Sequence, residues 1–300
     1  NLEGDSSDVY MLMGGEREID WESAPEEEAI VVGTQDMLIS RALMRGYGMS
    51  RYKWPVHFGL LHNDAFWVFD ETQLMGPTVE TSAQLQAFRD SLGTAKPTHS
   101  MWMSATVADN QLDTVDHPRP DDGWARLDLS AADRESQAVD QRLESRKLVV
   151  KSAATVPNST GKNRLEDYGQ ALASYMLDSY SEGDLTLVVA NTVGRARAIY
   201  EQIDSAIDEG PEVTLIHSRF RKHERARREE ALEEDGGRIV VATQVVEAGV
   251  DLSAKTLFTE LAPWSSVVQR IGRCNRYGEF DSDGGAQVFW IDAEDGDKAA

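Results

Sequence analysis

Short apolar runs alternate along this chain with segments whose apolar residues recur at helical spacing. The runs at Ala29 to Gly33 (AIVVG), Phe66 to Phe69 (FWVF) and residues 98–103 predict buried strands. The residues between them predict helices, one through Leu43 and one over residues 79–92. Strands that alternate with helices are typical of a parallel sheet with helices on its faces. The first third of the chain therefore predicts an α/β domain.

A second block of the same kind follows an acidic, proline-bearing stretch, DNQLDTVDHPRPDDG, at residues 109–123. Strands are predicted at residues 185–190, 213–216, 239–242, 257–261 and 288–291, and a helix carries the stripe Ala196, Ile199, Tyr200, Ile203 and Ile207. We expect a first domain over residues 1–108, an acidic linker over 109–124 and a second domain over 125–300, with a cleft between the two lobes. Ligands of such sheets bind beyond the carboxyl ends of the strands.

Composition fits a globular protein, because 41% of the 300 residues are hydrophobic. No apolar run approaches the roughly 18 residues of a membrane span, and no secretory signal is visible. The single cysteine, Cys274, excludes an internal disulfide and fits a reducing cytosol, so we expect a cytoplasmic protein. The chain starts at Asn1, and we expect the natural start to lie elsewhere.

Charge argues at first against a nucleic-acid partner, because the formal net charge is −22. Two explanations are open: the acids are a surface adaptation to high salt, which would suit a halophilic host, or the chain does not bind nucleic acid. Basic residues cluster at 217–228, HSRFRKHERARR, with six Arg or Lys in twelve residues. The cluster fits a phosphate-binding surface, and a solvated helix face is an equal alternative.

Two adjacent acids, Asp70 and Glu71, end the apolar strand FWVF. Acids are common where strands leave a core, so the pair alone is ambiguous. The alternative is a Walker-B element, in which the Asp binds the magnesium of a nucleotide and the Glu handles the attacking water. Thirty-four residues after Asp70, the sequence Ser104-Ala105-Thr106 ends the next predicted strand. One strand–helix–strand crossover would place both elements side by side at one sheet edge, although an isolated Ser-Ala-Thr is more often an ordinary strand end.

The second block carries Ala242-Thr243 and then Glu247-Ala248-Gly249-Val250-Asp251 after a strand. Gly249 permits close backbone approach, and Asp251 can accept from a ribose hydroxyl, although a strand followed by a plain turn is the alternative.

The most specific stretch is QRIGRCNR, residues 269–276, with a glutamine and three arginines at helical spacing around Gly272. No acid inside the octet balances this charge, as a solvated helix would require. Arginines directed into a cleft stabilise the charge on a transferring phosphoryl group. An arginine-rich surface helix is the less favoured alternative.

Taken in order, these elements resemble a superfamily 2 helicase: motif II at DETQ, motif III at SAT, motif V at ATQVVEAGVD and motif VI at QRIGRCNR. Within that superfamily the chain is most similar to the helicase core of the CRISPR type I interference helicase-nuclease, in a subtype with the nuclease after the helicase. The stretches GTQDMLISRAL, RGYGMSRYKWPVHFGLL, EAGVDLS and PWSSVVQRIGRCNRYGE carry this likeness. The resemblance implies two tandem RecA-like domains, and it leaves out residues 108–183.

The resemblance also implies roles for individual residues. Asp70 would hold Mg²⁺ and Glu71 would activate water, while Arg273 and Arg276 would be arginine fingers for ATP. Gln269 would contact phosphate or couple the lobes, Gly249 would belong to the ATP site, and Asp251 would contact the ribose. Coupling between the lobes would use Gln73, Ser104 and Thr106. Single-stranded DNA would contact residues in loops of both lobes, namely Gly14, Gly15, Thr34, Arg219 and Thr243.

As further implications of the resemblance, the motor would move 3′ to 5′ on single-stranded DNA and work with the CRISPR RNA-guided surveillance complex. The chain departs from the family in one respect: no G-x-x-x-x-G-K-[ST] loop occurs. We therefore expect the first domain to be N-terminally incomplete and the chain alone to hydrolyse ATP poorly.

No His-Asp dipeptide occurs either, so we expect the metal-dependent HD nuclease on a continuation or on another chain. His57 and His62 are expected to be structural. Two alternatives stay open, which are another superfamily 2 DNA or RNA helicase and a truncated, non-catalytic fragment that binds nucleic acid.

Overall fold

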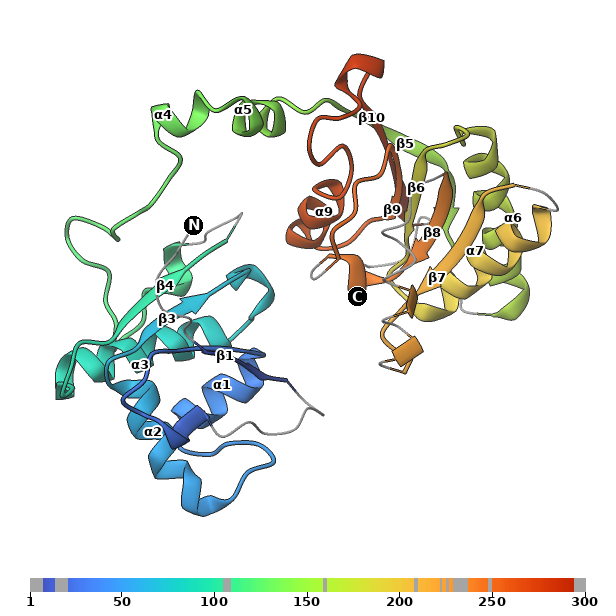
Figure 1. Cartoon of the computed structure of the whole chain (residues 1–300). Helices are drawn as coiled ribbons and strands as arrows, with labels where there is room; N and C mark the ends of the chain where they lie inside the picture. The colour runs from blue at the N-terminus through green and yellow to red at the C-terminus, as the bar shows by residue number, and fades with distance from the viewer. Residues whose placement is uncertain are drawn as a thin grey trace. The chain divides into compact units, whose positions relative to one another are not determined.

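The computed structural model describes residues 8–13, 21–104, 109–158, 161–207, 210–221, 223–224, 227–228, 237–247 and 250–293. The chain divides into two compact units, residues 1–126 and 127–300, which are described one at a time (Figure 1).

The first unit places its strands in two parallel pairs, β1 with β2 and β3 with β4. Its strands and α-helices are β1 (Asp8–Leu12), β2 (Ala29–Gly33), α1 (Gln35–Ala42), α2 (Trp54–His62), β3 (Phe66–Phe69), α3 (Thr78–Leu92) and β4 (His99–Trp102). Short 3₁₀ turns lie at Trp21–Ser23, Arg51–Lys53, Thr72–Leu74 and Asp109–Gln111. Both pairs are parallel, as the alternation of strands and helices predicts, but the described residues form two small sheets instead of one.

The core of the first unit lies between its strands and its three helices. Leu12, Ile39, Leu61, Trp67 and Leu85 are all less than 9% exposed and belong to one cluster. The outward side chains of the strands stay exposed, and those of Ile30 and Phe66 are 53% and 65% exposed. Strand β3 therefore has one covered face and one face open to solvent, whereas none of the residues of β2 and β4 is fully buried.

A ladder of rings ties the acidic segment 109–124 to the first unit. The rings of Trp67 and Phe69 stack, and Phe69 stacks on Trp102 with centroids 5.8 Å apart. Trp102 then contacts His117, which stacks on Trp124 at 4.7 Å. The segment for which the sequence predicted a linker is thus packed on strand β4 in this structure.

His57 and His62 are buried, as expected of structural histidines. His62 Nε2 lies 2.8 Å from the carbonyl oxygen of Ala42, and Nδ1 lies 3.5 Å from Nη1 of buried Arg89. Arg89 also donates to Gln86 Oε1 and Ser100 Oγ at 3.0 and 2.9 Å. Burial lowers the pKa of Arg89 to about 10. Burial lowers the pKa of His62 too, and the nearby Arg89 cation adds to that effect.

Acid is therefore expected to destabilise the first unit through His62. Its pKa is below the ordinary 6.5 in the folded state, so its contribution to folding is complete above pH 6.5 and is lost as the pH falls below that value. While the folded and unfolded states differ by one proton, the loss is about 1.4 kcal/mol for each pH unit. Denaturant unfolding of the wild type and of His62→Gln from pH 8 to pH 5 measures it. Parallel pH profiles of the two proteins would contradict the expectation.

The second unit is built on a six-stranded parallel sheet with the order β5-β10-β9-β6-β8-β7. The elements in chain order are α4 (Ala131–Arg134), α5 (Gln137–Leu143), β5 (Lys147–Val156), α6 (Lys162–Asp178), β6 (Leu185–Val189), α7 (Val193–Ala206), β7 (Glu212–Ile216), β8 (Arg238–Ala242), β9 (Thr256–Glu260), α9 (Trp264–Ile271) and β10 (Ala286–Ala293). Two 3₁₀ turns lie at Gln244–Val246 and Asp281–Asp283.

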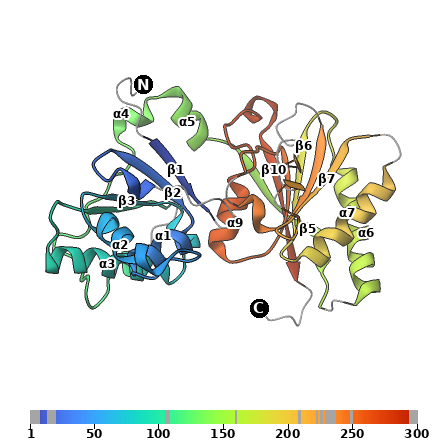
Figure 2. The ribbon, with the colours of Figure 1, turned by 60° about the horizontal axis from the view of Figure 1, so that its bottom comes forward.

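Helices α6 and α7 lie side by side on one face of this sheet, and α9 lies on the other side (Figures 1 and 2). The strand residues alternate accordingly, so that Val188 belongs to the cluster under α6 and α7 while Leu187 belongs to the opposite cluster. The helices α6 and α7 approach closely at Gly169, where a Cβ atom would lie 2.6 Å from the carbonyl oxygen of Ala198.

The predicted parallel α/β class is confirmed, and the predicted strands are present within one or two residues. Strand β5 and helix α6, in the stretch that the resemblance leaves out, were missed. One detail was wrong: helix α9 ends at Ile271, so Arg273 and Arg276 lie beyond it and not at helical spacing. The backbone of Cys274 instead forms an isolated parallel β-bridge with that of Ala254, and Asn275 has a φ of 46°. No helix in the described part of the chain is long and apolar enough to cross a membrane.

Candidate functional site

The first group of candidate residues lies where β3 and β4 end side by side. The strands pair in parallel from Phe66 and His99 to Phe69 and Trp102. The pairing continues past their ends, because the backbone N–H of Thr72 donates to the carbonyl of Met103 at 3.0 Å. Helix α3 makes the crossover between the two strands. The expected juxtaposition of motif II and the start of motif III is therefore present.

Glu71 has an unusual backbone conformation, with φ 50° and ψ 48° in the left-handed region. For a non-glycine residue this conformation costs about 1 to 2 kcal/mol. Its backbone N–H donates to Asp70 Oδ1 at 2.9 Å, which orients the neighbouring carboxylate. Asp70 is exposed and Glu71 is half-buried. The turn thus places the two acids differently toward solvent, and strained backbone of this kind clusters at functional sites.

Gln73 links motif II to motif III. Its Nε2 donates to Glu71 Oε2, and its Oε1 accepts from Ser104 Oγ, both at 2.5 Å. The bond to Glu71 fixes the orientation of the amide, because a flipped amide would turn its oxygen toward the carboxylate, which only accepts. The residues predicted to couple the lobes are therefore in contact within the first unit, apart from Thr106, which lies outside the described residues.

An exposed carboxylate such as Asp70 can serve as one protein ligand of Mg²⁺, which usually takes one or two carboxylates together with phosphate oxygens and waters. The described residues contain no group of three His, Cys, Asp or Glu side chains that could hold a metal ion by themselves. The donor set therefore fits a nucleotide-bound magnesium better than a metal site made by the protein alone.

In the second unit the predicted DNA contact Thr243 lies at the carboxyl ends of the strands, beside residues that follow two neighbouring strands. Asn191 follows β6, His217 follows β7 and Thr243 follows β8. Two backbone bonds join these ends, from Thr243 to Ile216 and from Ala190 to Ala242. This is the edge at which parallel α/β sheets bind ligands.

Asp251 and Arg276, predicted at the ribose and at the phosphates, form an ion pair in which Nη1 and Oδ1 are 3.4 Å apart. Tyr277 Oη also donates to Asp251 Oδ1 at 2.7 Å, and this hydrogen bond, with burial, raises the pKa of Tyr277. The side chain of Arg276 is 37% exposed and that of Asp251 is 72% exposed. An exposed pair of this kind contributes little to stability, so a ligand can displace it at low cost.

Arg273 differs from Arg276, because its guanidinium points into the protein. It is 8% exposed, and Nε and Nη2 donate to the backbone carbonyls of Val246 and Glu247 at 3.1 and 3.0 Å. These carbonyls belong to motif V. In this conformation Arg273 therefore joins motif VI to motif V and does not present its charge to solvent.

The residues predicted to contact nucleic acid differ in their access to solvent. Thr34 is exposed at the N-terminus of α1, a position suited to phosphate, and Arg219 is exposed after β7. Thr243 is only 2% exposed. Gly14, Gly15 and the nucleotide-site candidate Gly249 lie outside the described residues. Gln269 is half-buried on α9.

Three charged residues of the second unit were missed at the sequence level. Arg270, Glu247 and Glu260 are 2%, 5% and 1% exposed and form a buried polar network. The missing acid inside QRIGRCNR was the available signal, because the acid that pairs with Arg270 is 23 residues away in sequence.

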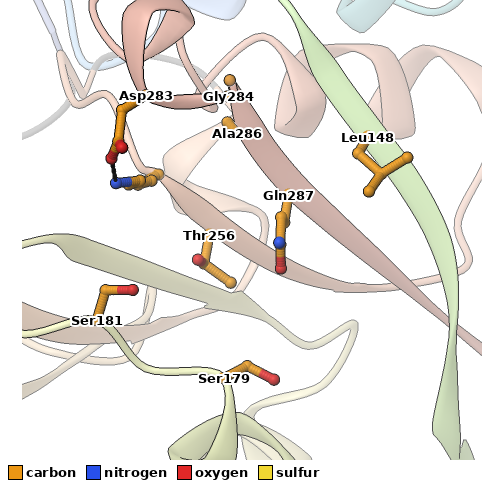
Figure 3. Close-up of a pocket in the computed structure, with 10 residues that line it drawn as sticks. Leu148, Ser179, Ser181, Thr256, Asp283, Gly284, Ala286 and Gln287 are labelled. Carbon is orange, nitrogen blue, oxygen red and sulfur yellow. Dashed lines mark hydrogen bonds and ion pairs between the residues drawn. The ribbon is translucent and has the colours of Figure 1, made fainter.

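A pocket of about 220 Å³ lies at the opposite edge of the second sheet, where the strands begin (Figure 3). Thr256, Ala286 and Gln287 line it at the starts of β9 and β10. Lys255, also in its lining, pairs with Asp283 and with Asp184. The pocket is therefore separate from the candidate site at the carboxyl edge.

Comparison with known proteins finds sequence similarity in the second unit. Residues 182–279 match the family described as CRISPR-associated nuclease/helicase Cas3, C-terminal. This confirms the resemblance to Cas3 helicases. The CRISPR-associated helicase Cas3 of Thermoproteus tenax is 34% identical over 102 residues, which is 32% of this chain and 17% of that protein. The nuclease/helicase Cas3 of Haloferax volcanii is 40% identical over 86 residues, or 27% of this chain and 9% of that protein.

Solved structures show the same fold over nearly the whole chain. The crystal structure of T. fusca Cas3 superposes with a TM-score of 0.68 at 18% identity, over 98% of this chain and 38% of that one. The Mycobacterium smegmatis helicase Lhr superposes with a TM-score of 0.58 at 15% identity, over 96% and 35%. The chain therefore has the fold of the matched parts of these helicase structures. The chain spans less than two fifths of T. fusca Cas3, and its matches cover still smaller shares of the curated relatives.

Proposed function

We propose that this chain is the motor part of an ATP-driven translocase on single-stranded DNA that serves CRISPR type I interference. The observation that carries the proposal is the grouping of helicase motifs at the carboxyl edges of the sheets. In the first unit Glu71, Gln73 and Ser104 form one hydrogen-bonded chain. In the second unit Asp251 and Arg276 form an ion pair in a region with Cas3 sequence similarity.

In the proposed reaction Asp70 would hold the magnesium of ATP, and Glu71 accepts a proton from the attacking water. When bound, Mg²⁺ would neutralise charge on the transferring phosphoryl group. The hydrogen bond from Gln73 holds the Glu71 carboxylate in place. Because Gln73 also holds Ser104, a movement of motif III reaches the catalytic carboxylate through a single side chain.

The second unit supplies the groups that recognise the rest of the nucleotide. Arg276 exchanges Asp251 for phosphate oxygens, and Asp251 then accepts from the ribose. Arg273 reaches the phosphates only if it leaves the carbonyls of motif V, so we propose that it positions motif VI in the conformation described here. Gln269 would contact phosphate, and Gly249 would also belong to the ATP site.

The first unit would need a phosphate-binding loop for full activity. The 300 residues contain no G-x-x-x-x-G-K-[ST] sequence. We propose that residues outside this sequence supply the loop, that residues 1–108 and 125–300 are the two RecA-like domains, and that the 300 residues alone hydrolyse ATP poorly. The exposed apolar faces of β2 and β3 are surfaces that such a segment can cover.

Thr34 and Arg219 would contact the DNA backbone, together with Gly14, Gly15 and Thr243. The RNA-guided surveillance complex would deliver the strand, and the HD nuclease would cut it from a continuation or from another chain. With a net charge of −22, binding must depend on local clusters such as the one that contains Arg219.

The salt dependence of DNA affinity tests whether binding depends on local basic clusters. Single-stranded DNA affinity should fall steeply between about 50 and 200 mM salt, with a log–log slope near −0.7 for each phosphate contact. Arg219→Ala should make the slope shallower by about one contact. Fluorescence anisotropy of a labelled oligothymidine measures both proteins, and Arg134→Ala, an exposed arginine on α4, is the matched control. An affinity that does not change with salt, which is a slope of zero, would exclude phosphate contacts.

The same titration separates the alternatives. Equal or tighter binding of single-stranded RNA would favour another superfamily 2 helicase. Strong DNA binding without DNA-stimulated ATP hydrolysis in the full-length protein would favour a non-catalytic binding module.

A further inference from the structure

The guanidinium of Arg270 is the centre of a buried network in the second unit. Arg270 lies on α9 and is 2% exposed. Nε donates to Glu247 Oε1 at 2.8 Å, and Nη1 donates to Thr259 Oγ1 and to the carbonyl of Glu260 at 3.2 and 3.0 Å. Nη2 donates to Asn191 Oδ1 at 3.0 Å. One side chain therefore joins motif V, strand β9 and the loop after β6.

The carboxylate of Glu260 holds the same loop from the other side. It accepts from the backbone N–H of Asn191 at 2.7 Å, from Arg195 Nε at 2.8 and 3.0 Å, and from Tyr168 Oη at 3.1 Å. Burial and the neighbouring Glu260 raise the pKa of Tyr168 well above its ordinary value, so its hydroxyl stays a donor. Two arginines balance two glutamates, and the network is electrically neutral.

Asn191 is fixed by three hydrogen bonds. Besides the bonds to Arg270 and Glu260, its Nδ2 donates to the carbonyl of Leu261 at 2.6 Å. The amide can satisfy Arg270 and Leu261 together in only one orientation, because a flip would place donor against donor. A shift of the loop that starts at Asn191 must therefore move Arg270 or break these bonds.

Buried ion pairs are weak evidence for stability, since their desolvation offsets much of their attraction. Their better-attested effect is to fix one geometry. Here the fixed geometry extends to the nucleotide side, because the backbone carbonyl of Glu247, whose side chain binds Arg270, accepts from Arg273 Nη2.

We infer that Arg270 is a positioning residue that couples the loop at Asn191 to the arginines of motif VI. This loop follows β6 beside the end of β8, where the proposed DNA contact Thr243 lies. The inference rests on the proposed function. Binding of a strand at the carboxyl edge of β6 shifts Asn191, and Arg270 passes the shift to Glu247 and from there to Arg273.

The decisive readout is the ratio of DNA-stimulated to basal ATP turnover in the full-length protein, with oligothymidine as the strand. Arg270→Lys keeps a cation beside Glu247 but cannot form the fork to Thr259 and Asn191. We expect the ratio to fall about tenfold, within the usual range of coupling between sites, while the DNA dissociation constant changes less than about threefold.

Asn191→Ser is the second variant, because its shortened side chain cannot reach Arg270 and its half-exposed position spares the core. If Asn191 acts through Arg270, the ratio of stimulated to basal turnover in the double variant should be no lower than in the more strongly affected single variant. Tyr168→Phe is the matched control: it removes one buried bond to Glu260 and leaves Arg270 intact, so the ratio should not change.

The possible results are distinct. A wild-type protein without DNA-stimulated turnover overturns the proposed function and this inference with it. If DNA stimulates turnover in the wild type, three results would overturn the inference alone. These are an equal fall of basal and stimulated rates in Arg270→Lys, additive effects of the two substitutions, and a fall of the ratio in Tyr168→Phe as large as that in Arg270→Lys. Should Arg270→Lys fail to fold, an unchanged ratio in Asn191→Ser overturns it.

Discussion

Glu71→Gln in the full-length protein is expected to lower DNA-stimulated ATP turnover by about 10² to 10⁴, the usual effect of removing one acid–base group. Glutamine keeps the size of the side chain, but it cannot take a proton from water. Asp70 would still bind magnesium, so the affinity for ATP should stay near that of the wild type. Steady-state turnover and binding of a fluorescent ATP analogue measure the two effects separately.

Two variants serve as controls. Glu28→Gln makes the same chemical change at an exposed acid of the first unit and should leave turnover unchanged. Asp70→Asn should weaken magnesium-dependent nucleotide binding as well as turnover. If Glu71→Gln stays within about twofold of the wild type, far from the catalytic range, the two acids are only the end of a strand.

Much of the fold could be predicted because its signals are local. Apolar runs such as FWVF mark strands whatever surrounds them, and β3 has the predicted bounds, but its Phe66 and Val68 are exposed and not buried as predicted. The spacing of motifs II and III implied one crossover, and the parallel pairing of β3 and β4 follows from it. Helix α6 was missed although it carries a local signal as well, because its buried Tyr168, Leu172 and Met176 recur at helical spacing.

Parts of the candidate site could not be predicted because they depend on contacts distant in sequence. The pairing of Arg270 with Glu247 and the burial of Arg273 on motif V carbonyls arise only when β8, β9 and α9 pack together. The left-handed backbone of Glu71 has no sequence signal, since glycine or asparagine is the usual residue there. The arginines of motif VI were therefore predicted as a uniform row, whereas the structure gives each one a different environment.

That difference leads to the expected result for Arg276. Arg276→Ala should reduce ATP turnover by about 10³ or more, as loss of an arginine finger does, and leave the fold intact.

The structure shows why the fold should survive. The guanidinium of Arg276 is part of an exposed pair with Asp251, and such pairs contribute at most about 1 kcal/mol to stability. Thermal unfolding should therefore hardly change. Arg276→Lys keeps the charge without the planar fork and should recover only a small part of the rate.

Arg197→Ala is the matched control, because Arg197 forms an ion pair with Glu201 at the same 3.4 Å distance on the surface of α7. Its basal turnover should equal that of the wild type. A loss of less than about tenfold in Arg276→Ala, well below the effect of an arginine finger, would show that the pair with Asp251 is only a surface ion pair. In that case the remaining candidate in motif VI is Arg273, which would have to leave the carbonyls of Val246 and Glu247 before it could reach a phosphate.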